Sequence, residues 1–496
     1  MLRKIRLILA SVFFIGMTLL FVDFTGALHH WFGWMAKIQF LPALLAMNLV
    51  ILIGLIVLTL IFGRIYCSVI CPLGVMQDVI ARLRRKKNKY SYSKAVSWLR
   101  YSMLGVMVVA LVAGIASVVQ LLAPYSSFGR IATHILQPIW QWGNNILAAI
   151  AEHFNSYAFY TTDVWLKSVP TFLIALVTLL LIGFLAWRNG RTYCNTICPV
   201  GTVLGFLSRF SFFKVHFVED KCRNCSLCSK NCKAACIDFK THTVDYSRCV
   251  ACGNCIDQCK FGALKYSHVS AIAKRGASEV SATETEAIDK GKRSFFLATA
   301  LLTTAAIAQE KKKVDGGLAV IEDKVAPRRS TPITPPGSLS ADNMAKRCTG
   351  CQLCVSECPN GVLRPTTDLL KIMQPVMSYE RGYCRPECTR CSDVCPTGAI
   401  HPITRADKSA VQIGHAVWIK KNCIPITDGV ECGNCARHCP TGAIEMIPLD
   451  EEDENTPFVP AVNEAACIGC GACENLCPAR PFSAIYVEGH EVHKNI

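Results

Sequence analysis

The residues best suited to chemistry are cysteines, and two closely spaced runs of them lie in the middle of the chain. The first run holds Cys222, Cys225, Cys228 and Cys232, and the second holds Cys249, Cys252, Cys255 and Cys259. Both have the spacing Cys-x2-Cys-x2-Cys-x3-Cys, in which three neighbouring thiolates bind one [4Fe–4S] cluster and the fourth reaches a second cluster. We therefore predict one cluster on Cys222, Cys225, Cys228 and Cys259, and another on Cys249, Cys252, Cys255 and Cys232. A zinc ribbon is the alternative, but zinc needs only two cysteine pairs, whereas each run places four thiolates within eleven residues.

Four further quartets lie between residue 340 and the C-terminus. They are Cys348, Cys351, Cys354 and Cys358; Cys384, Cys388, Cys391 and Cys395; Cys423, Cys432, Cys435 and Cys439; and Cys467, Cys470, Cys473 and Cys477. Two have the standard spacing, and the other two widen only the first gap, which indicates loops inserted around an unchanged cluster. The chain is therefore predicted to hold six [4Fe–4S] clusters, with the pairing of the last four left open by the spacing.

The full cysteine count supports this division. Of 29 cysteines, six quartets use 24, two Cys-x3-Cys-Pro motifs use four more, and Cys236 remains. The repeated spacing argues against a disulfide framework, because such frameworks belong to short secreted chains. Cys236 is either an alternative cluster ligand or a small buried thiol beside the cluster, and we favour the buried thiol.

An internal repeat carries the two Cys-x3-Cys-Pro motifs. G-R-I-Y-C-S-V-I-C-P-L-G (63–74) recurs as G-R-T-Y-C-N-T-I-C-P-V-G (190–201), so Cys67 and Cys71 correspond to Cys194 and Cys198. On a helix, this spacing places the two thiols on one face. We predict a thiol pair, or four thiols shared between the repeats, with redox or metal chemistry. The alternative is a structural turn whose cysteines serve as small buried hydrophobic residues.

The composition indicates a protein partly embedded in a membrane. Hydrophobic residues make up 51% of the chain, the mean hydropathy is +0.32, and residues 5–21, 41–62, 96–122 and 169–187 form apolar segments. We predict four spans within a membrane domain of residues 1–205. Basic residues gather on one side of these spans, including the run 82–89, so both ends of the domain are predicted to face the cytoplasm. The net charge of +16 is explained by this placement better than by nucleic-acid binding.

Residues 124–168 join the third and fourth spans and are rich in aromatic residues. We expect one or two amphipathic helices that lie along the membrane surface. The predicted spans contain no histidine, which argues against a b-type haem; His29, His30, His134 and His153 fall in the predicted outer loops. With Asp23, these histidines are candidate acceptors of quinol protons, although an interfacial histidine is more often simply solvated.

The remaining boundaries follow from composition. A two-cluster module of residues 206–270 is predicted to be cytoplasmic, and residues 271–339 form a linker before a four-cluster domain of residues 340–496. Within the linker lies a short segment, residues 293–308, whose residues 295–308 are apolar, follow Lys292 and Arg293, and end in Ala-Ile-Ala. This segment is either a fifth short helix or an export signal for a folded domain, similar to a twin-arginine signal, which would place the last four clusters in the periplasm.

The first part of the chain resembles the NapH and MauN type of membrane ferredoxin, on the basis of its spans, its two Cys-x3-Cys-Pro motifs and its paired cluster motif. The last part resembles NapG, a periplasmic protein with four clusters, so the chain is similar to a fusion of the two. The resemblance implies an α-helical membrane bundle joined to α+β ferredoxin-like modules. It also implies a quinol dehydrogenase component of the bacterial inner membrane, which passes electrons from the quinol pool to a periplasmic reductase or cytochrome.

Alternative functions come from other classes. Membrane ferredoxins of the FixG type carry the same motif and are connected with copper handling, and soft thiolates suit Cu(I). A metal reductase or assembly factor is therefore the second hypothesis, and a regulatory protein that senses clusters is the third. The sequence has no dinucleotide-binding glycine fingerprint and no P-loop, which argues against nucleotide chemistry.

Overall fold

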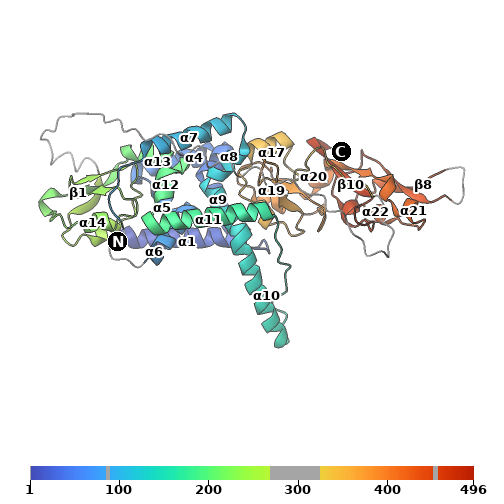
Figure 1. The fold of residues 1–496 in the computed structure, drawn as a ribbon, viewed down its shortest axis with the longest axis horizontal. Helices are drawn as coiled ribbons and strands as arrows, with labels where there is room; N and C mark the ends of the chain where they lie inside the picture. The colour runs from blue at the N-terminus through green and yellow to red at the C-terminus, as the bar shows by residue number, and fades with distance from the viewer. Residues whose placement is uncertain (1, 85–89, 269–323, 451–455) are drawn as a thin grey trace, which may run out of the picture.

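The computed structural model describes residues 2–84, 90–268, 324–450 and 456–496. Figure 1 shows three parts in a row: a helical bundle in the middle, a first Cys-rich module (213–268) at one end, and a second Cys-rich domain (324–496) at the other. Helix α1 (Leu2–Val22) runs along the bundle from the first module toward the second domain. The predicted fifth helix or export signal at 293–308 lies outside the described residues.

The bundle is built from helices of very different lengths. The longer ones are α1, α4 (Leu49–Phe62), α6 (Pro72–Leu83), α7 (Ser97–Val112), α10 (Gln137–His153) and α11 (Val169–Asn189). The shorter ones are α2 (His29–Lys37), α3 (Phe40–Leu45), α5 (Ile65–Val69), α8 (Ala116–Leu122), α9 (Pro124–Ile131), the π-helix η1 (Ala132–Leu136), α12 (Thr192–Thr196), α13 (Pro199–Leu207) and the 3-10 helix η2 (Ser208–Phe210).

Two of the four predicted spans are continuous helices. Among the described helices, only α1 and α11 are both long and apolar enough to cross a membrane. Each has 21 residues, which at 1.5 Å per residue is about 31 Å, close to the ~30 Å of a bilayer core. The other two predicted spans are interrupted, so four unbroken spans are not confirmed.

The two interruptions have local causes. The segment 41–62 breaks at Met47, whose φ is +54°, and α4 restarts where the Asn48 side chain accepts a hydrogen bond from the Ile51 amide. The segment 96–122 breaks at Gly114, whose φ is +71°. Hydropathy averages over such turns, because it measures apolar content and not helix continuity.

The expectation that residues 124–168 lie along the surface is wrong for their first part. All eight residues of α9 are buried, and Phe21 of α1 packs against Tyr125 and Phe128 with ring centroids 5.8 and 6.1 Å apart. Tyr125 and Phe128 are used in the core because α9 lies between the bundle and the second domain, whereas Trp140, Trp142, Tyr157 and Tyr160 farther along the segment are exposed.

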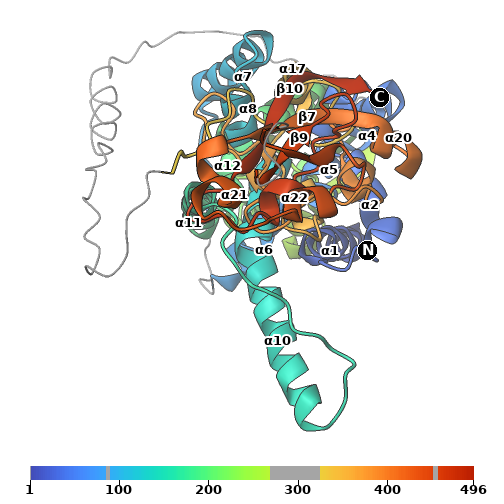
Figure 2. The same ribbon diagram turned by 90° about the vertical axis from the view of Figure 1, so that its right-hand side faces the viewer.

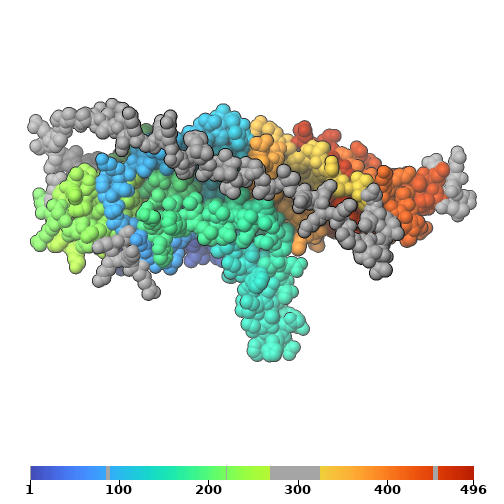
Figure 3. Space-filling view, in the orientation of Figure 1, coloured from blue at the N-terminus to red at the C-terminus, as the bar shows by residue number. Residues whose placement is uncertain are grey.

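Helix α10 does leave the body of the molecule. Figures 1 and 2 show it projecting across the long axis, and Figure 3 shows it standing clear of the rest of the surface. Its exposed residues include Ile139, Trp140, Trp142, Ile146 and Ile150. This shape agrees with the predicted amphipathic helix, and its position on a membrane stays a prediction.

The first Cys-rich module is a small α+β unit. Strand β1 (Phe213–Phe217) pairs antiparallel with β4 (Leu264–His268), and β2 (Ile237–Asp238) pairs with β3 (Thr243–Val244). Between them lie the 3-10 helix η3 (Glu219–Lys221), α14 (Leu227–Lys230) and α15 (Asn254–Gln258). The module rests on α4, because Phe213 stacks on Phe62 at 5.8 Å and the Tyr266 hydroxyl donates to the Phe62 carbonyl at 3.0 Å.

The second Cys-rich domain contains three antiparallel pairs and several one-turn helices. The pairs are β5 (Leu363–Pro365) with β6 (Pro375–Met377), β7 (Val411–Trp418) with β10 (Ile485–Asn495), and β8 (Ile444–Pro448) with β9 (Phe458–Val462). The helices are α17 (Ala341–Arg347), α18 (Leu353–Ser356), α19 (Arg390–Val394), α20 (Arg405–Ala410), η4 (Lys420–Asn422), α21 (Ile424–Thr427), α22 (Asn434–Arg437) and α23 (Ala472–Asn475).

The last part of the predicted linker is folded onto this domain. Residues 333–338 are buried, the Met377 amide donates to the Ile333 carbonyl at 2.9 Å, and the His401 amide donates to the Gly337 carbonyl at 2.8 Å. The prolines of this stretch suggested a linker, but they pack as an extended strap. The folded domain therefore reaches back at least to residue 324.

Candidate metal centres

The internal repeat folds into two matching turns. Gly63 and Gly190 have φ of +72° and +73°, which a glycine adopts without strain, and each is followed by one helical turn that carries the first cysteine. The second cysteine precedes the next helix, whose first residue is Pro72 or Pro199, a favoured position because proline has no amide hydrogen to satisfy there.

These turns bring all four thiols of the repeat together inside the bundle. Cys67, Cys71, Cys194 and Cys198 are each 4% exposed, and Cys198 lies within electrostatic range of the other three. The Gln77 amide donates to the Cys194 sulfur at 3.3 Å, and the Gly201 amide donates to the Cys198 sulfur at 3.3 Å. The four thiols of the two repeats therefore lie close together, and redox or metal chemistry on them stays a prediction.

The arginine of each repeat contacts the backbone of the other repeat. Arg64 donates to the Cys194 carbonyl at 3.0 Å and lies 3.8 Å from the Cys67 sulfur, while Arg191 donates to the Cys67 carbonyl. Glycines make room for this exchange: a Cβ at Gly74 would lie 3.0 Å from Arg191, and one at Gly201 would lie 2.8 Å from Arg64. The sequence prediction named only the cysteines of the repeat, although the place of both arginines inside the repeated motif was a usable signal.

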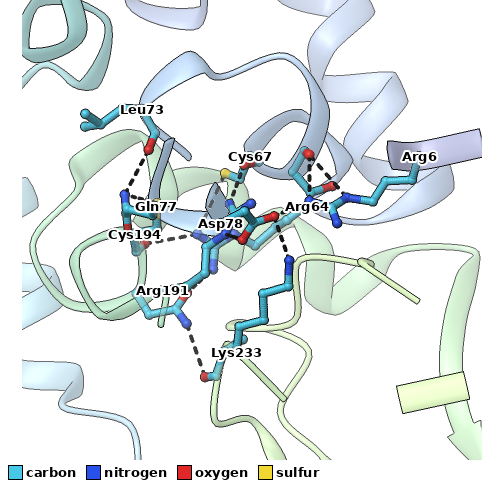
Figure 4. Close-up of polar contacts among 12 residues, drawn as sticks. Arg6, Arg64, Cys67, Leu73, Gln77, Asp78, Arg191, Cys194 and Lys233 are labelled. Carbon is cyan, nitrogen blue, oxygen red and sulfur yellow. Dashed lines mark hydrogen bonds and ion pairs between the residues drawn. The ribbon is translucent and has the colours of Figure 1, made fainter. Parts of the chain in front are cut away.

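A buried carboxylate neutralises one of the two arginines. Asp78 accepts from Arg191 at 2.8 Å and is also paired with Arg6 and, at 2.7 Å, with Lys233, as Figure 4 shows. Burial alone would raise the pKa of Asp78, but these three cations hold it well below its usual range. Asp78 is therefore ionised, and it ties together α1, α6, the second repeat and the first module.

The other arginine has only neutral partners. Arg64 is fully buried and donates to the Asn195 side chain at 2.8 Å and to the carbonyls of Ser247 and Cys194, with no carboxylate partner in the described part of the chain. Burying a charge without a counter-charge is costly. An anionic centre on the neighbouring thiolates would supply the missing charge.

The second repeat lies directly against the first module. The Arg191 amide donates to the Lys233 carbonyl at 2.8 Å, and the Asn195 side chain donates to the Ala234 carbonyl at 3.2 Å. Both carbonyls follow Cys232 in the sequence.

Asp245 holds Ser247, the residue of the first module that Arg64 contacts, by accepting a hydrogen bond from its hydroxyl. Burial would raise the pKa of Asp245, but hydrogen bonds from Ser247 and Arg248 keep that pKa below its usual value.

In the first module the eight predicted ligands form two groups. One group, Cys222, Cys225, Cys228 and Cys259, lines a small apolar cavity. The other group has Cys255 within electrostatic range of Cys252, Cys249 and Cys232. Both groups combine three cysteines of one run with the fourth of the other. Cys236 is buried beside the second group, with its sulfur 3.5 Å from that of Cys232.

In the second domain the structure shows the pairing that spacing left open. The sixteen cysteines gather as group A (Cys348, Cys351, Cys354, Cys395), group B (Cys384, Cys388, Cys391, Cys358), group C (Cys467, Cys470, Cys473, Cys439) and group D (Cys423, Cys432, Cys435, Cys477). Every group takes its fourth member from a neighbouring quartet.

The four groups follow one another along the domain. Cys354 of group A neighbours Cys391 of group B, and the Cys384 amide of group B donates to the Cys470 carbonyl of group C at 2.9 Å. Cys473 of group C neighbours Cys435 of group D. In group D, Cys423 directly precedes α21 and Cys435 lies on α22, and both helices are at the free end of the molecule (Figure 1).

Group A sits on the bundle. The Gln120 side chain donates to the Cys348 carbonyl at 3.4 Å, and a Cβ at Gly129 would lie 2.3 Å from the Cys351 carbonyl. Arg130, which was predicted to lie in an outer loop, is fully buried here and donates to the Gln120 carbonyl at 2.7 Å. The Tyr193 hydroxyl of the second repeat reaches α8 at 3.3 Å, so α8 and α9 separate group A from the four-thiol site by a single layer.

Among the candidate proton acceptors, His134 has different surroundings from those predicted. His134 is buried in η1 and bonded to Gln352 of the second domain, so it is not a solvated loop residue. Asp23 accepts from the amides of Thr25 and Leu28, both at 2.8 Å, which closes the turn after α1. His30 and His153 are exposed, and His29 is half-buried with its pKa lowered by burial.

A cavity of about 680 Å³ adjoins group B. It is lined by Phe24 just after α1, by Tyr160, Trp165 and Lys167 of the segment 154–168 that follows α10, and by Cys358. Lys167 donates to the Val355 carbonyl at 3.1 Å, and burial lowers its pKa to about 8. The cavity therefore lies between the bundle, the segment 154–168 and Cys358, a predicted cluster ligand.

The donor sets fit iron–sulfur clusters. In the described residues, no three His, Cys, Asp or Glu side chains converge closely enough for a single metal ion. A cubane holds its four thiolates farther apart than one ion does, so this spacing is compatible with a cluster. The uncompensated charge on Arg64 also fits, because a cubane on four thiolates is anionic.

Comparisons with known families agree with this assignment. A family described as "4Fe-4S binding domain" matches residues 44–90 and 169–217, and the cysteines in those ranges are Cys67, Cys71, Cys194 and Cys198. Two families described as "4Fe-4S dicluster domain" match residues 347–401 with 430–480, and residues 245–362.

Curated relatives are ferredoxin-type proteins. MauM of Paracoccus denitrificans, a methylamine utilization ferredoxin-type protein, is 33% identical over 168 residues, which is 32% of this chain and 73% of the relative. NapH of Haemophilus influenzae is 27% identical over 229 residues, 44% of this chain and 68% of the relative. MauN of Methylobacillus flagellatus is 27% identical over 208 residues, 41% and 61% respectively. No solved structure matches the chain.

Proposed function

Because the chain belongs to the family of ferredoxin-type proteins that includes MauM, we propose that it is an electron conduit that runs the length of the molecule. The observation that carries the proposal is the position of the four-thiol site. This site touches the first module through Lys233 and Ser247, and it is one helix layer away from group A. A redox centre on these four thiols would connect the two Cys-rich parts.

The protein's own residues give the four-thiol site its properties. When bound there, a [4Fe–4S] cluster supplies a carrier for one electron. The four cysteines hold it, Arg64 and Arg191 place positive charge beside it, and Gln77 and the Gly201 amide donate hydrogen bonds to sulfur. Hydrogen bonds and positive charge favour the reduced cluster, and burial keeps water away. With the six clusters of the Cys-rich parts, the chain would hold seven.

Membrane insertion of the bundle is part of the proposal. Helices α1 and α11 have the length and composition of spans, and Arg84, Lys94 and Arg188 of the bundle line one cavity with Lys233 and Arg248 of the first module. The first module and the second domain lie at opposite ends of the bundle, and α10 projects sideways near the second domain (Figure 1). This arrangement supports a cytoplasmic first module, a periplasmic second domain and an interfacial α10.

The proposed donor is a quinol of the membrane pool, and the proposed acceptor is a periplasmic reductase or cytochrome. The cavity of about 680 Å³ beside Cys358 supports a quinol there, because its aromatic residues suit a ring and group B lies at its wall. Electrons from this quinol would enter the conduit part-way along, at group B, and the four-thiol site would join the first module to the same row of clusters. Group D, at the free end of the second domain, is the place where electrons would leave for the acceptor.

Iron content tests the proposal. Seven cubanes predict about 28 iron atoms per chain in anaerobically purified protein. Replacement of Cys67, Cys71, Cys194 and Cys198 by Ser should lower the count to about 24, and a Cys236→Ser control should leave it unchanged. About 24 irons in both the native chain and the four-Ser variant would return the four thiols to a structural role. About eight irons in the native chain would leave the second domain empty and end the conduit model.

A further inference from the structure

A second cavity, of about 540 Å³, lies where the bundle meets the first module. Its walls are the end of α6, the C-terminal end of α11, the outer face of α12, the strap of residues 90–96 and the segment after Cys232. The charged residues that line it are all basic: Arg84, Lys94, Arg188, Lys233 and Arg248. None of its lining residues is acidic.

Two of these five basic residues have a carboxylate partner. Lys233 pairs with Asp78 at 2.7 Å, and Arg248 pairs with Asp245 at 2.6 Å. Arg84 donates to the carbonyls of Trp187 and Arg188 at 3.1 and 2.6 Å, which leaves its charge uncompensated. Lys94 and Arg188 likewise have no carboxylate partner among the described residues. A concave site lined by charge of one sign concentrates ions of the opposite sign.

The surface next to the cavity is apolar. Phe184 and Trp187 on α11 are 59% and 48% exposed, and Val79 and Leu83 on the adjoining α6 are 45% and 64% exposed. A tryptophan at the end of an apolar helix is typical of the level where hydrocarbon meets headgroups. The basic cavity therefore opens at headgroup height, above a surface suited to acyl chains.

We infer that this cavity binds the phosphate headgroup of an anionic phospholipid from the cytoplasmic leaflet. Basic pockets beside membrane helices on the cytoplasmic side bind such headgroups, and the apolar surface beside this one favours a lipid over a soluble anion. The inference rests on the membrane insertion proposed above. Asn195 and Lys233 line the cavity and also connect the four-thiol site to the first module. A bound lipid would therefore stabilise the contact between the second repeat and the first module.

Lipid binding to the full chain tests this inference. The protein is reconstituted in nanodiscs of phosphatidylcholine, and the affinity for a fluorescent phosphatidylglycerol is measured in the native chain and in an Arg84→Gln, Lys94→Gln, Arg188→Gln variant. Each basic residue near a membrane surface strengthens anionic lipid binding about fivefold, so the triple variant should bind on the order of 100-fold more weakly. The matched control removes three exposed lysines of the first module, Lys240, Lys260 and Lys265, and should bind within about twofold of the native chain.

The outcomes separate this inference from the proposed function. Equal affinity in the triple variant and the native chain overturns the lipid site, as does displacement of the lipid by millimolar inorganic phosphate, which would mark a site for a soluble anion. Iron content is measured on the same preparations. A weaker-binding triple variant with full iron content supports the lipid site, whatever the conduit does. Recovery of the native chain from the soluble fraction would overturn both proposals.

Discussion

The two copies of the repeat have nearly the same backbone but different electrostatic surroundings. Asp78 follows the first copy, four residues after Gly74, and it neutralises the arginine of the second copy. At the equivalent place after Gly201 stands Gly205, where a Cβ would lie 2.5 Å from the Ser247 carbonyl and 2.7 Å from Arg100. One arginine is therefore paired with a carboxylate, and the other donates only to neutral groups.

This difference shows how a duplicated motif builds one site whose two arginines have different partners. The symmetric parts, two glycines, two arginines and four cysteines, create the enclosure. The asymmetric positions decide what each half contacts: the carboxylate holds α1 and Lys233, and the glycine lets Ser247 and Arg100 approach. Four thiolates beside buried cations that outnumber the one carboxylate, Asp78, suit an anionic cluster better than an empty structural turn.

Among these variants, Asp78→Asn should have the largest effect, and the quantity it changes is the stability of the protein. The substitution leaves Arg6, Arg191 and Lys233 buried without a counter-charge, and loss of one partner from a buried ion pair costs about 3–5 kcal/mol. We expect a comparable loss in the free energy of unfolding, measured by denaturant titration in detergent. A loss below about 1 kcal/mol would show that the network does not hold the bundle together.

Gly201→Ala should have the next largest effect and tests the symmetric part of the site. The new Cβ would lie 2.3 Å from the Cys194 carbonyl, and relief of such overpacking costs about 1–3 kcal/mol. Gly74→Ala should behave alike, because its Cβ would meet the Cys67 carbonyl at the same distance. The matched control is Gly105→Ala in α7, where a Cβ meets nothing within 4 Å, and it should not destabilise the protein. Equal stability of all three variants would contradict the packing described.

Arg64→Gln tests the asymmetric part of the site, in which Arg64 has no carboxylate partner. Removal of the arginine that lacks a carboxylate partner takes positive charge and a charged donor away from the thiolates. A hydrogen bond to a charged group is worth about 1.5–3 kcal/mol, which for one electron corresponds to a reduction potential roughly 65–130 mV lower. The measurement is a redox titration followed by electron paramagnetic resonance, with Arg100→Gln as the neighbouring control. No signal that shifts in Arg64→Gln would contradict a redox centre at this place.

Cys236→Ala should have the smallest effect, a small change in the reduction potential of one cluster. Cys236 lies in the segment of the first module that packs against the second repeat. The Cys236 thiol lies 3.5 Å from the Cys232 sulfur, a neutral contact worth about 0.5–1.5 kcal/mol. Its removal should lower the potential of one cluster in the first module by roughly 20–65 mV without loss of iron. Loss of four irons would instead make Cys236 a ligand.

Sequence spacing predicted the local parts of these sites but not the parts that depend on tertiary packing. The quartets are contiguous, so their grouping in the first module could be predicted from Cys222 to Cys259. The four-thiol site joins residues more than a hundred positions apart, and only the repeat hinted at it. The burial of α9 was missed because Tyr125 and Phe128 are equally consistent with an interface and a core. The breaks at Met47 and Gly114 were missed because hydropathy is insensitive to backbone turns.

The most direct test of the conduit is electron transfer across a sealed membrane. Vesicles that contain the purified chain are loaded with a membrane-impermeant oxidising dye, and an impermeant reductant is added outside. The account predicts that the dye is reduced in vesicles with the native chain, and that reduction falls to the rate of protein-free vesicles when Cys194 and Cys198 are changed to Ser. Dye reduction at the native rate in that variant, with about 24 irons still bound, would contradict the claim that electrons pass through the four-thiol site.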